Sequence, residues 1–197
     1  MEEFDIAVIG GGPAGIMAAI AASADSNVVL LEKNSSLGHK LLITGGGRCN
    51  ITNEKPIKKL LNSFHDKNFL KHSFYTFTNE MLLDLFRNRG LDFIIEDNNR
   101  VFPETEKSQD ILAILKDYLK DITIKYNYKV SDIKKENNFV INNDIIAKKV
   151  IIATGGATFP KTGSAGDGYC LTDNPVTDIK YGLVPLITKK DLSDIAG

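Results

Sequence analysis

Three glycines near the start of the chain have the spacing of a phosphate-binding turn. Residues 10–15 read GGGPAG, so Gly10, Gly12 and Gly15 fit the pattern G-x-G-x-x-G. Each glycine has a separate task when the pattern lies between a strand and a helix. The first permits a tight turn, the second lets the backbone approach a pyrophosphate, and the third lets the helix pack close to the strand.

The flanking residues supply that context. Residues 4–9 (FDIAVI) predict a buried parallel strand, residues 13–24 predict a helix that begins with Pro13 and Ala14, and residues 27–32 predict a second strand. The backbone N–H groups at the start of the helix would face the phosphates. Glu32, which ends the second strand, would accept hydrogen bonds from ribose hydroxyls, and its charge disfavours NADP at this site. The pattern does not separate NAD from FAD.

A second glycine cluster follows soon after the second strand. Residues 44–50 read TGGGRCN, and flexible backbone at this point suits an extended ligand such as FAD. Either Arg48 or Lys40 would offset the charge of a pyrophosphate. The alternative is a surface loop, with Cys49 as a small packing residue or a bystander. The candidate cofactor contacts in this loop are Thr44, Gly45, Gly46, Gly47, Arg48 and Asn50.

The third glycine cluster follows a change of periodicity. Short alternating segments near residues 122–149 predict a small antiparallel meander, which runs into an apolar strand at residues 150–153. Four small residues suited to close approach of a cofactor follow: Ala153, Thr154, Gly155 and Gly156. The alternative is an exit loop that serves only chain direction. The main chain at Val130 would reach the adenine, and residues 162–169 (TGSAGDGY) would line the flavin or a substrate cleft, or serve structure alone.

The remaining segments predict the elements that support these loops. Residues 57–71, 79–88 and 108–119 predict helices, and residues 91–96 predict a strand. Residues 98–105 predict a turn, in which Pro103 would end any regular element. No internal repeat or long linker interrupts the order of elements.

Composition narrows the class of protein. The 197 residues are 43% hydrophobic and 25% charged, with a formal net charge of −1, so we expect a small-molecule substrate and neither nucleic acid nor a membrane as partner. The lysine pairs are interpreted as solvated faces. Two distant cysteines predict no metal site and no disulfide framework. The acidic N-terminus is unlike a secretory signal, and a cytoplasmic location is expected. The oligomeric state stays open.

Taken together, the segments resemble one family, the BaiN-like or aminoacetone oxidase family of NAD(P)/FAD-dependent flavoproteins. The resemblance covers nearly all of the chain and rests on GGGPAG, LLEKN, GHKLLITGGGRCNITN, RVFPET, ATGGATFPKTGSAGDGY and LVPL, which recur in family order. It implies an α/β fold of the glutathione-reductase-like FAD/NAD(P)-binding Rossmann type, with a second domain inserted. It also implies FAD, held by the residues above together with Lys33.

The family resemblance also sets an expectation for domain organisation. Residues 1–186 would form the N-terminal part of the FAD-binding domain, and residues 187–197 would begin the connection to an inserted domain that lies beyond this chain. The implied activity is FAD-dependent transfer of hydride between a reduced nicotinamide, NAD(P)H, and an organic substrate or oxygen. The alternatives are a non-catalytic fragment that binds dinucleotides and a flavoprotein of tRNA modification. No catalytic acid or base is identifiable from the sequence.

Overall fold

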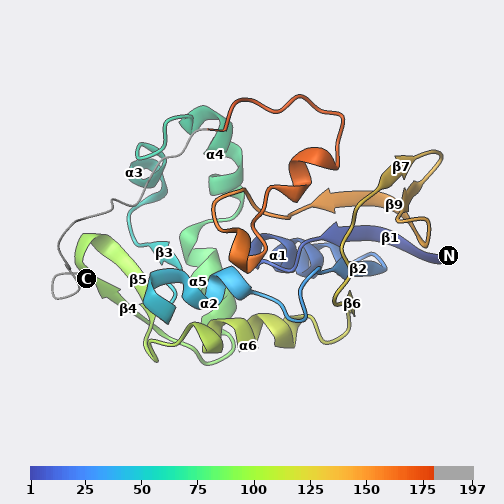
Figure 1. Cartoon of the computed structure of the whole chain (residues 1–197). Coiled ribbons are helices and arrows are strands. Elements are labelled where there is room, and N and C mark those ends of the chain that lie inside the picture. The colour runs from blue at the N-terminus through green and yellow to red at the C-terminus, as the bar shows by residue number, and fades with distance from the viewer. Residues whose placement is uncertain (180–197) are drawn as a thin grey trace, which may run out of the picture.

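A six-stranded sheet forms the centre of the protein in a computed structural model that describes residues 1–179 (Figure 1). The strand order is β6-β2-β1-β9-β8-β7. β1 (Glu2–Ile9) lies between β2 (Val28–Leu31) and β9 (Ile145–Ile152), and all of its pairings are parallel. The predicted strand–turn–helix–strand unit is confirmed, with α1 (Pro13–Ala22) as its helix.

The two faces of the sheet bury alternate residues of the same strands. Val8 and Leu30 face a helical layer made by α1, α5 (Asn79–Arg87) and α6 (Ser108–Tyr118). Ala7 and Val29 point the other way, into a smaller cluster that contains Val130. Since side chains alternate along a strand and both faces are covered, these strands are apolar throughout.

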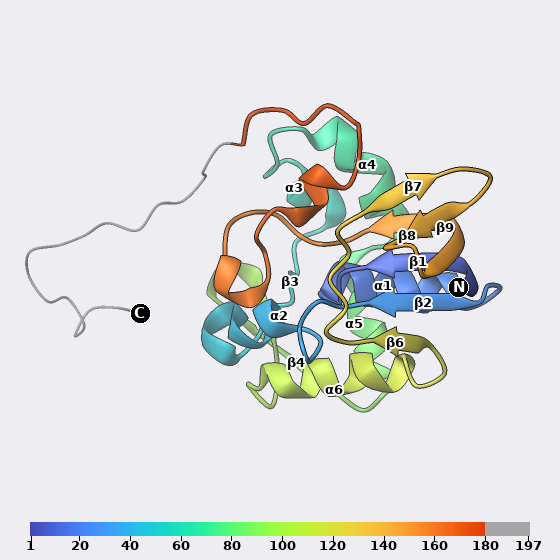
Figure 2. The same ribbon diagram turned by 45° about the vertical axis from the view of Figure 1, so that its right-hand side comes forward.

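The predicted meander is confirmed only in its second half. β7 (Ile133–Lys135), β8 (Phe139–Ile141) and β9 pair antiparallel, and Figure 2 shows their hairpin at one edge of the sheet. The prediction was wrong for β6 (Thr123–Lys125), which pairs parallel with β2 and so extends the main sheet. The segments predicted as a meander strand and a separate apolar strand form one continuous strand, β9, because its whole length pairs with β1.

A second, three-stranded sheet lies beside the helical layer, in the order β3-β5-β4. It contains β3 (Thr52–Asn53), β4 (Phe93–Glu96) and β5 (Arg100–Pro103), all antiparallel. The turn predicted at residues 98–105 is therefore partly wrong, because four of its residues form β5; Pro103 is the last of them. A short α2 (His39–Ile43) connects the two sheets.

The single helix predicted at residues 57–71 is two helices. α3 (Ile57–Leu61) and α4 (Lys67–Thr76) are separated by polar residues, and Asp66 caps α4 by accepting a hydrogen bond from the Phe69 N–H at 3.5 Å. Asn, Ser and Asp side chains compete for backbone hydrogen bonds, so they favour such a break. None of the helices within residues 1–179 is long and apolar enough to cross a lipid bilayer. The predicted domain boundary after residue 186 and the LVPL segment lie outside the described residues.

Candidate functional site: the dinucleotide cradle

The turn between β1 and α1 is closely packed at two of its three glycines. Gly10 has φ +107°, and a Cβ there would lie 2.6 Å from the Ala153 carbonyl oxygen. A Cβ at Gly15 would lie 1.8 Å from the Gly10 carbonyl oxygen. A Cβ at Gly12 would meet no atom within 4 Å. The open side of the turn is therefore at Gly12, where the pattern predicts approach of a pyrophosphate.

The start of α1 offers backbone donors toward that open side. Gly12 is the N-cap residue, and among the described residues no side chain caps this end of the helix. The first N–H groups of a helix have no partner within the helix, and they carry the positive end of its dipole. This geometry fits an anionic group in front of Gly12 and Ala14.

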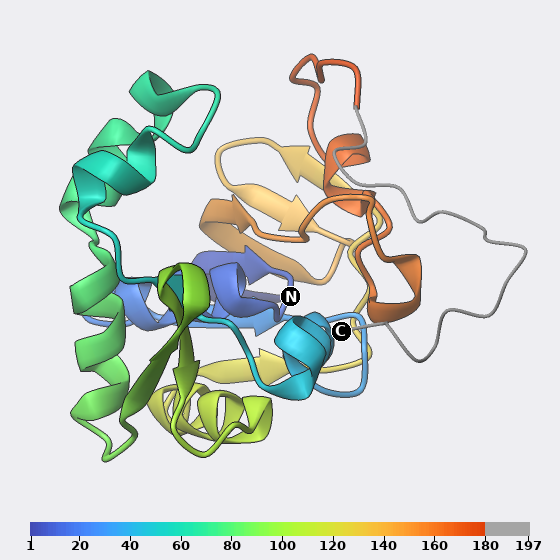
Figure 3. The same cartoon turned by 90° about the vertical axis from the view of Figure 1, so that its left-hand side faces the viewer.

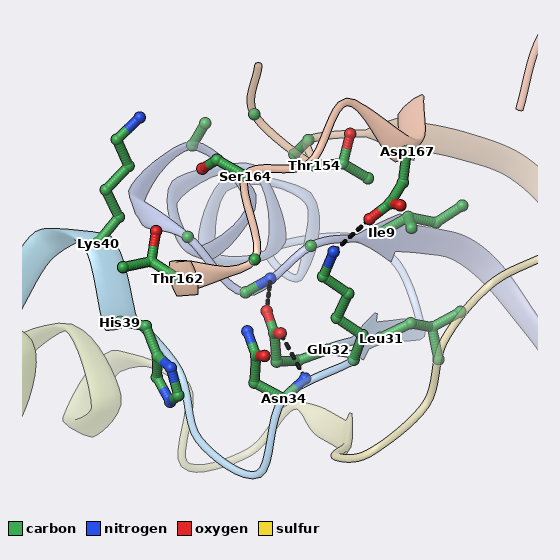
Figure 4. A pocket seen from close by; sticks show the side chains of 18 of the residues that line it. Ile9, Leu31, Glu32, Asn34, His39, Lys40, Thr154, Thr162, Ser164 and Asp167 are labelled. Carbon is green, nitrogen blue, oxygen red and sulfur yellow. Dashed lines mark hydrogen bonds and ion pairs between the residues drawn. The ribbon is translucent and has the colours of Figure 1, made fainter. Parts of the chain in front are cut away.

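Glu32 is buried and is held by main-chain donors. Its Oε2 accepts a hydrogen bond from the Gly11 N–H at 2.6 Å, and its Oε1 accepts one from the Asn34 N–H at 2.7 Å (Figure 4). A carboxylate has about four acceptor positions, so two remain for ligand hydroxyls. Gly11 was not among the predicted contacts, although its place between Gly10 and Gly12 was a signal. A Cβ on Gly11 would lie 2.8 Å from Glu32 Oε2.

A cavity of about 170 Å³ lies at the carboxyl ends of β1, β2 and β9. It brings together most of the predicted cofactor contacts: Gly10, Gly12, Pro13, Ala14, Glu32, Lys33, Lys40, Val130, Ala153, Thr154 and Gly155. It also contains residues that the predicted set missed: Gly11, Asn34, Gly38, His39, Tyr128 and Lys129. Gly15 and Gly156 do not line it; Gly15 serves helix packing.

The loop at residues 162–169 closes one side of this cavity. Lys33 Nζ pairs with the Asp167 carboxylate, and both residues line the cavity; Figure 4 labels Asp167. Ser164 is buried, and the Gly166 N–H donates to the Gly156 carbonyl at 3.2 Å. This loop therefore lines the first cavity, and its predicted role beside the flavin or a substrate stays a prediction.

The loop at residues 44–50 lies beside a second cavity of about 290 Å³. Thr44 and Asn50 line this cavity with mainly apolar residues of α1, α5 and α6, and Pro13 and Lys40 line both cavities. The two cavities are therefore adjacent. Gly45, Gly46 and Gly47 line neither, although all three have positive φ angles.

Arg48 lines neither cavity. Its guanidinium donates to Glu96 at 2.6 Å and to Glu106 at 2.9 Å, and it lies 4.2 Å from the centroid of the Phe102 ring. These two carboxylates, Glu96 first, hold the pKa of the guanidinium above its ordinary value. The role predicted for Arg48 against a pyrophosphate stays a prediction. Lys40 Nζ donates to Thr158 Oγ1 at 2.9 Å, at the edge of the first cavity.

Cys49 lies in the second cavity and is buried. Burial raises the pKa of its thiol to about 11, so the thiol is protonated at neutral pH. A protonated, buried thiol is a poor nucleophile. This agrees with the interpretation of Cys49 as a packing residue. Within residues 1–179, no three His, Cys, Asp or Glu side chains gather as a metal-binding group.

Residues 4–181 match the family described as "HI0933-like protein Rossmann domain". The chain belongs to this family. The HI0933-like chain is 32% identical to a 3-dehydro-bile acid delta(4,6)-reductase of Clostridium scindens, over 94% of its own length and 48% of the relative's. It is 30% identical to a ribosomal RNA dihydrouridine synthase of Escherichia coli, over 98% of its own length and 50% of the relative's. It spans about half the length of the curated relatives that it matches.

A solved structure supports the fold of the HI0933-like chain. The 3-ketosteroid-delta4-(5alpha)-dehydrogenase of Rhodococcus jostii RHA1 superposes with a TM-score of 0.57 at 16% identity, covering 79% of this chain and 46% of the other. At this identity the likeness concerns the fold alone. The family resemblance and the Rossmann-type α/β fold predicted from the sequence are both confirmed.

Proposed function

We propose that this chain is the FAD-binding part of an FAD-dependent oxidoreductase. The observation that carries the proposal is the cavity that joins three features: the open side of the turn at Gly12, the buried Glu32 carboxylate, and the end of β9 at Ala153. Family membership supports FAD as the group that occupies it. When bound, FAD supplies the two-electron redox chemistry, and the chain supplies binding and orientation.

The two neighbouring cavities suit different parts of FAD. The N–H groups at Gly12 and Ala14 would bind the pyrophosphate, and Glu32 would bind the ribose. The main chain at Val130 would contact the adenine. The mainly apolar second cavity, with Thr44 and Asn50 at its edge, would take the flavin ring. Lys40 borders both cavities, so it would lie near the middle of the cofactor.

The names of the two relatives suggest one reaction class. A delta(4,6)-reductase of a 3-dehydro steroid and a dihydrouridine synthase both saturate a carbon–carbon double bond that is conjugated to a carbonyl. We infer that the whole protein reduces such a bond, with NAD(P)H as hydride donor and a proton from solvent. A small unsaturated carbonyl compound and a uracil base both fit this class.

The two cysteines are free thiols, which supports a reducing, cytoplasmic location.

Titration with FAD and with ADP, followed by flavin fluorescence and calorimetry, tests the proposal. We expect FAD to bind more tightly than ADP. We expect Glu32→Gln to weaken FAD binding about tenfold or more, because a charge-assisted hydrogen bond contributes roughly 1.5–3 kcal/mol. The matched control is Glu104→Gln, at an exposed glutamate outside both cavities.

Three outcomes would contradict the proposal in different ways. Equal affinity for FAD and ADP would mean that the flavin end is not engaged, as expected for a non-catalytic dinucleotide-binding fragment. A colourless protein that cannot be reconstituted with FAD would reject flavin binding altogether. Equal effects of Glu32→Gln and Glu104→Gln would remove Glu32 from the site. Thermal melting of both variants separates lost binding from lost folding.

A further inference from the structure

Residues 55–77 form an arm that has few partners in the rest of the structure. The arm contains α3 and α4, which pack on each other, and Figure 3 shows this helix pair standing at the periphery, away from the main sheet. No residue of α4 is buried. A ten-residue helix with no buried face gains little from tertiary packing, and such packing is the main source of helix stability in proteins. The exposed face of α4 therefore needs an explanation.

The arm is strongly basic within a chain of net charge −1. Residues 55–77 contain five lysines and one aspartate: Lys55, Lys58, Lys59, Lys67, Lys71 and Asp66. Within the described part of the chain, none of these lysines forms an ion pair with a carboxylate. The net charge of −1 therefore hides an uneven distribution of charge along the chain. The arm is a local cationic surface.

Aromatic side chains lie among these lysines. Phe69 is 81% exposed and Tyr75 is 53% exposed. Phe69, His72 and Tyr75 follow one another at intervals of three residues on α4, so they form one ridge on its outer face. Phe64 and Phe74 pack edge to face with ring centroids 5.3 Å apart, which ties the turn between the helices to α4.

We propose that the α3–α4 arm binds single-stranded RNA. Lysines attract the phosphate backbone, and exposed aromatic rings stack on bases, each stacked base contributing roughly 1–3 kcal/mol. The biological meaning of this surface rests on the proposed function, in which a uracil base is one of the two substrate types. The RNA that presents the base would then lie across the arm.

The composition of the arm favours RNA over a protein partner. Protein interfaces are depleted in lysine and enriched in arginine at their centres. The arm has five lysines and no arginine. A groove or platform for single strands combines unpaired cations with aromatic rings, which is the combination that α4 presents.

Fluorescence anisotropy with a labelled oligouridylate of about 12 nucleotides tests this proposal in the purified protein. We expect binding that weakens as KCl rises from about 50 to about 200 mM, because bound lysines release counterions from the phosphates. Lys58→Glu with Lys59→Glu should weaken binding at least about tenfold and reduce the salt slope by about 2. The matched control is Lys134→Glu with Lys135→Glu, an exposed lysine pair on β7, which should change affinity by less than about twofold.

Substitutions at Phe69 distinguish base stacking from protein contact. Phe69→Tyr keeps an aromatic face and should retain affinity, whereas Phe69→Leu keeps an apolar side chain without the ring and should lose about fivefold or more. Phe69 is mostly exposed, so neither change should alter folding. FAD affinity should be unchanged in every arm variant. Loss of RNA binding with intact FAD binding therefore separates this proposal from the proposed function.

Several results would overturn the proposal. One is absence of binding at about 50 mM KCl; another is an equal loss from the β7 lysine pair, which would mean non-specific attraction. Full affinity in Phe69→Leu would reject stacking. Protection of Phe69 from solvent in the purified protein without RNA would show that polypeptide covers the ridge instead.

Discussion

Two of the glycine-rich segments of this protein, residues 10–15 and 44–50, need glycine for different reasons. In the turn at residues 10–15, Gly10 and Gly15 are required by the packing of the chain itself, because a Cβ at either position would overlap backbone oxygen. In the loop at residues 44–50, Gly46 has open space around it but a φ of +68°. Close contacts to backbone oxygen dominate in the first segment, whereas all three glycines of the second have positive φ angles and only Gly45 among them would also bring a Cβ close to other atoms. Substitutions should therefore damage the first through the fold and the second through the shape of the loop.

The largest effect is expected at Gly15. Gly15→Val would force side-chain atoms into the Gly10 carbonyl and separate α1 from β1, and it should lower the free energy of unfolding by at least about 3 kcal/mol. Flavin binding should be lost with the fold. Thermal melting monitored by circular dichroism measures the change.

Gly12→Ala is the control within the same turn. Its Cβ meets no protein atom, so stability should change by less than about 1 kcal/mol. FAD affinity should still fall, since the new methyl occupies the open side of the turn. A Gly12→Ala variant that binds FAD normally would contradict the placement of the pyrophosphate.

The second prediction concerns Gly45 and Gly46. Gly45→Ala combines a φ of +61° with a Cβ 2.8 Å from the Asn50 nitrogen, so we expect about 2 kcal/mol or more of destabilisation. Gly46→Ala has only the conformational cost, about 1 kcal/mol. Both should weaken FAD binding about tenfold, because the shape of the loop determines the positions of Thr44 and Asn50. Equal stability of the two variants would contradict the difference in packing.

Local patterns predicted the first segment well, while long-range contacts decided the rest. The strand before Gly10, the helix after it and Glu32 follow from short-range periodicity and a known spacing. The parallel pairing of Thr123 with Val29 did not follow, because a three-residue strand carries no signal of its partner.

Of the glycines that line the first cavity, Gly10, Gly12 and Gly155 were predicted, whereas the side-chain contacts that join its distant segments were not. The ion pair between Lys33 and Asp167 joins residues 134 positions apart, and no local pattern links them. The hydrogen bond from the Gly11 N–H to Glu32 depends on how the turn meets the end of β2. Likewise the glycine-rich surroundings of Arg48 in the sequence predicted a cation available to a pyrophosphate. In the fold, Arg48 instead forms ion pairs with Glu96 and Glu106.

The third prediction tests that difference at Arg48. Arg48→Ala should destabilise the protein by about 1 kcal/mol, since partly exposed ion pairs contribute little and the Phe102 contact adds a small amount. FAD affinity should change by less than about threefold, because both carboxylates hold the guanidinium outside the cavities. Isothermal titration with FAD measures this. A loss of tenfold or more would instead support the pyrophosphate role predicted from the sequence.

The smallest effect is expected at Cys49. Cys49→Ser should leave FAD affinity within about twofold of the native value, because the buried side chain packs among mainly apolar residues of the second cavity. Iodoacetamide at about pH 8 should modify the exposed Cys170 well before Cys49. Mass spectrometry of the two peptides measures this order, and faster modification of Cys49 would identify it as a reactive thiol.

The pH dependence of stability gives an independent check on the same residue. The pKa of the Cys49 thiol is raised from 9.0 to about 11 by burial, so the unfolded chain releases this proton at lower pH than the folded chain. The contribution of this pKa difference to the free energy of unfolding is therefore fully present below pH 9 and is lost as pH rises through about 11. The free energy of unfolding of the native protein should therefore fall more steeply over this range than that of Cys49→Ser, since serine does not titrate there. Parallel curves for the two proteins would mean that the thiol is not buried, which would contradict the interpretation of Cys49 as a packing residue.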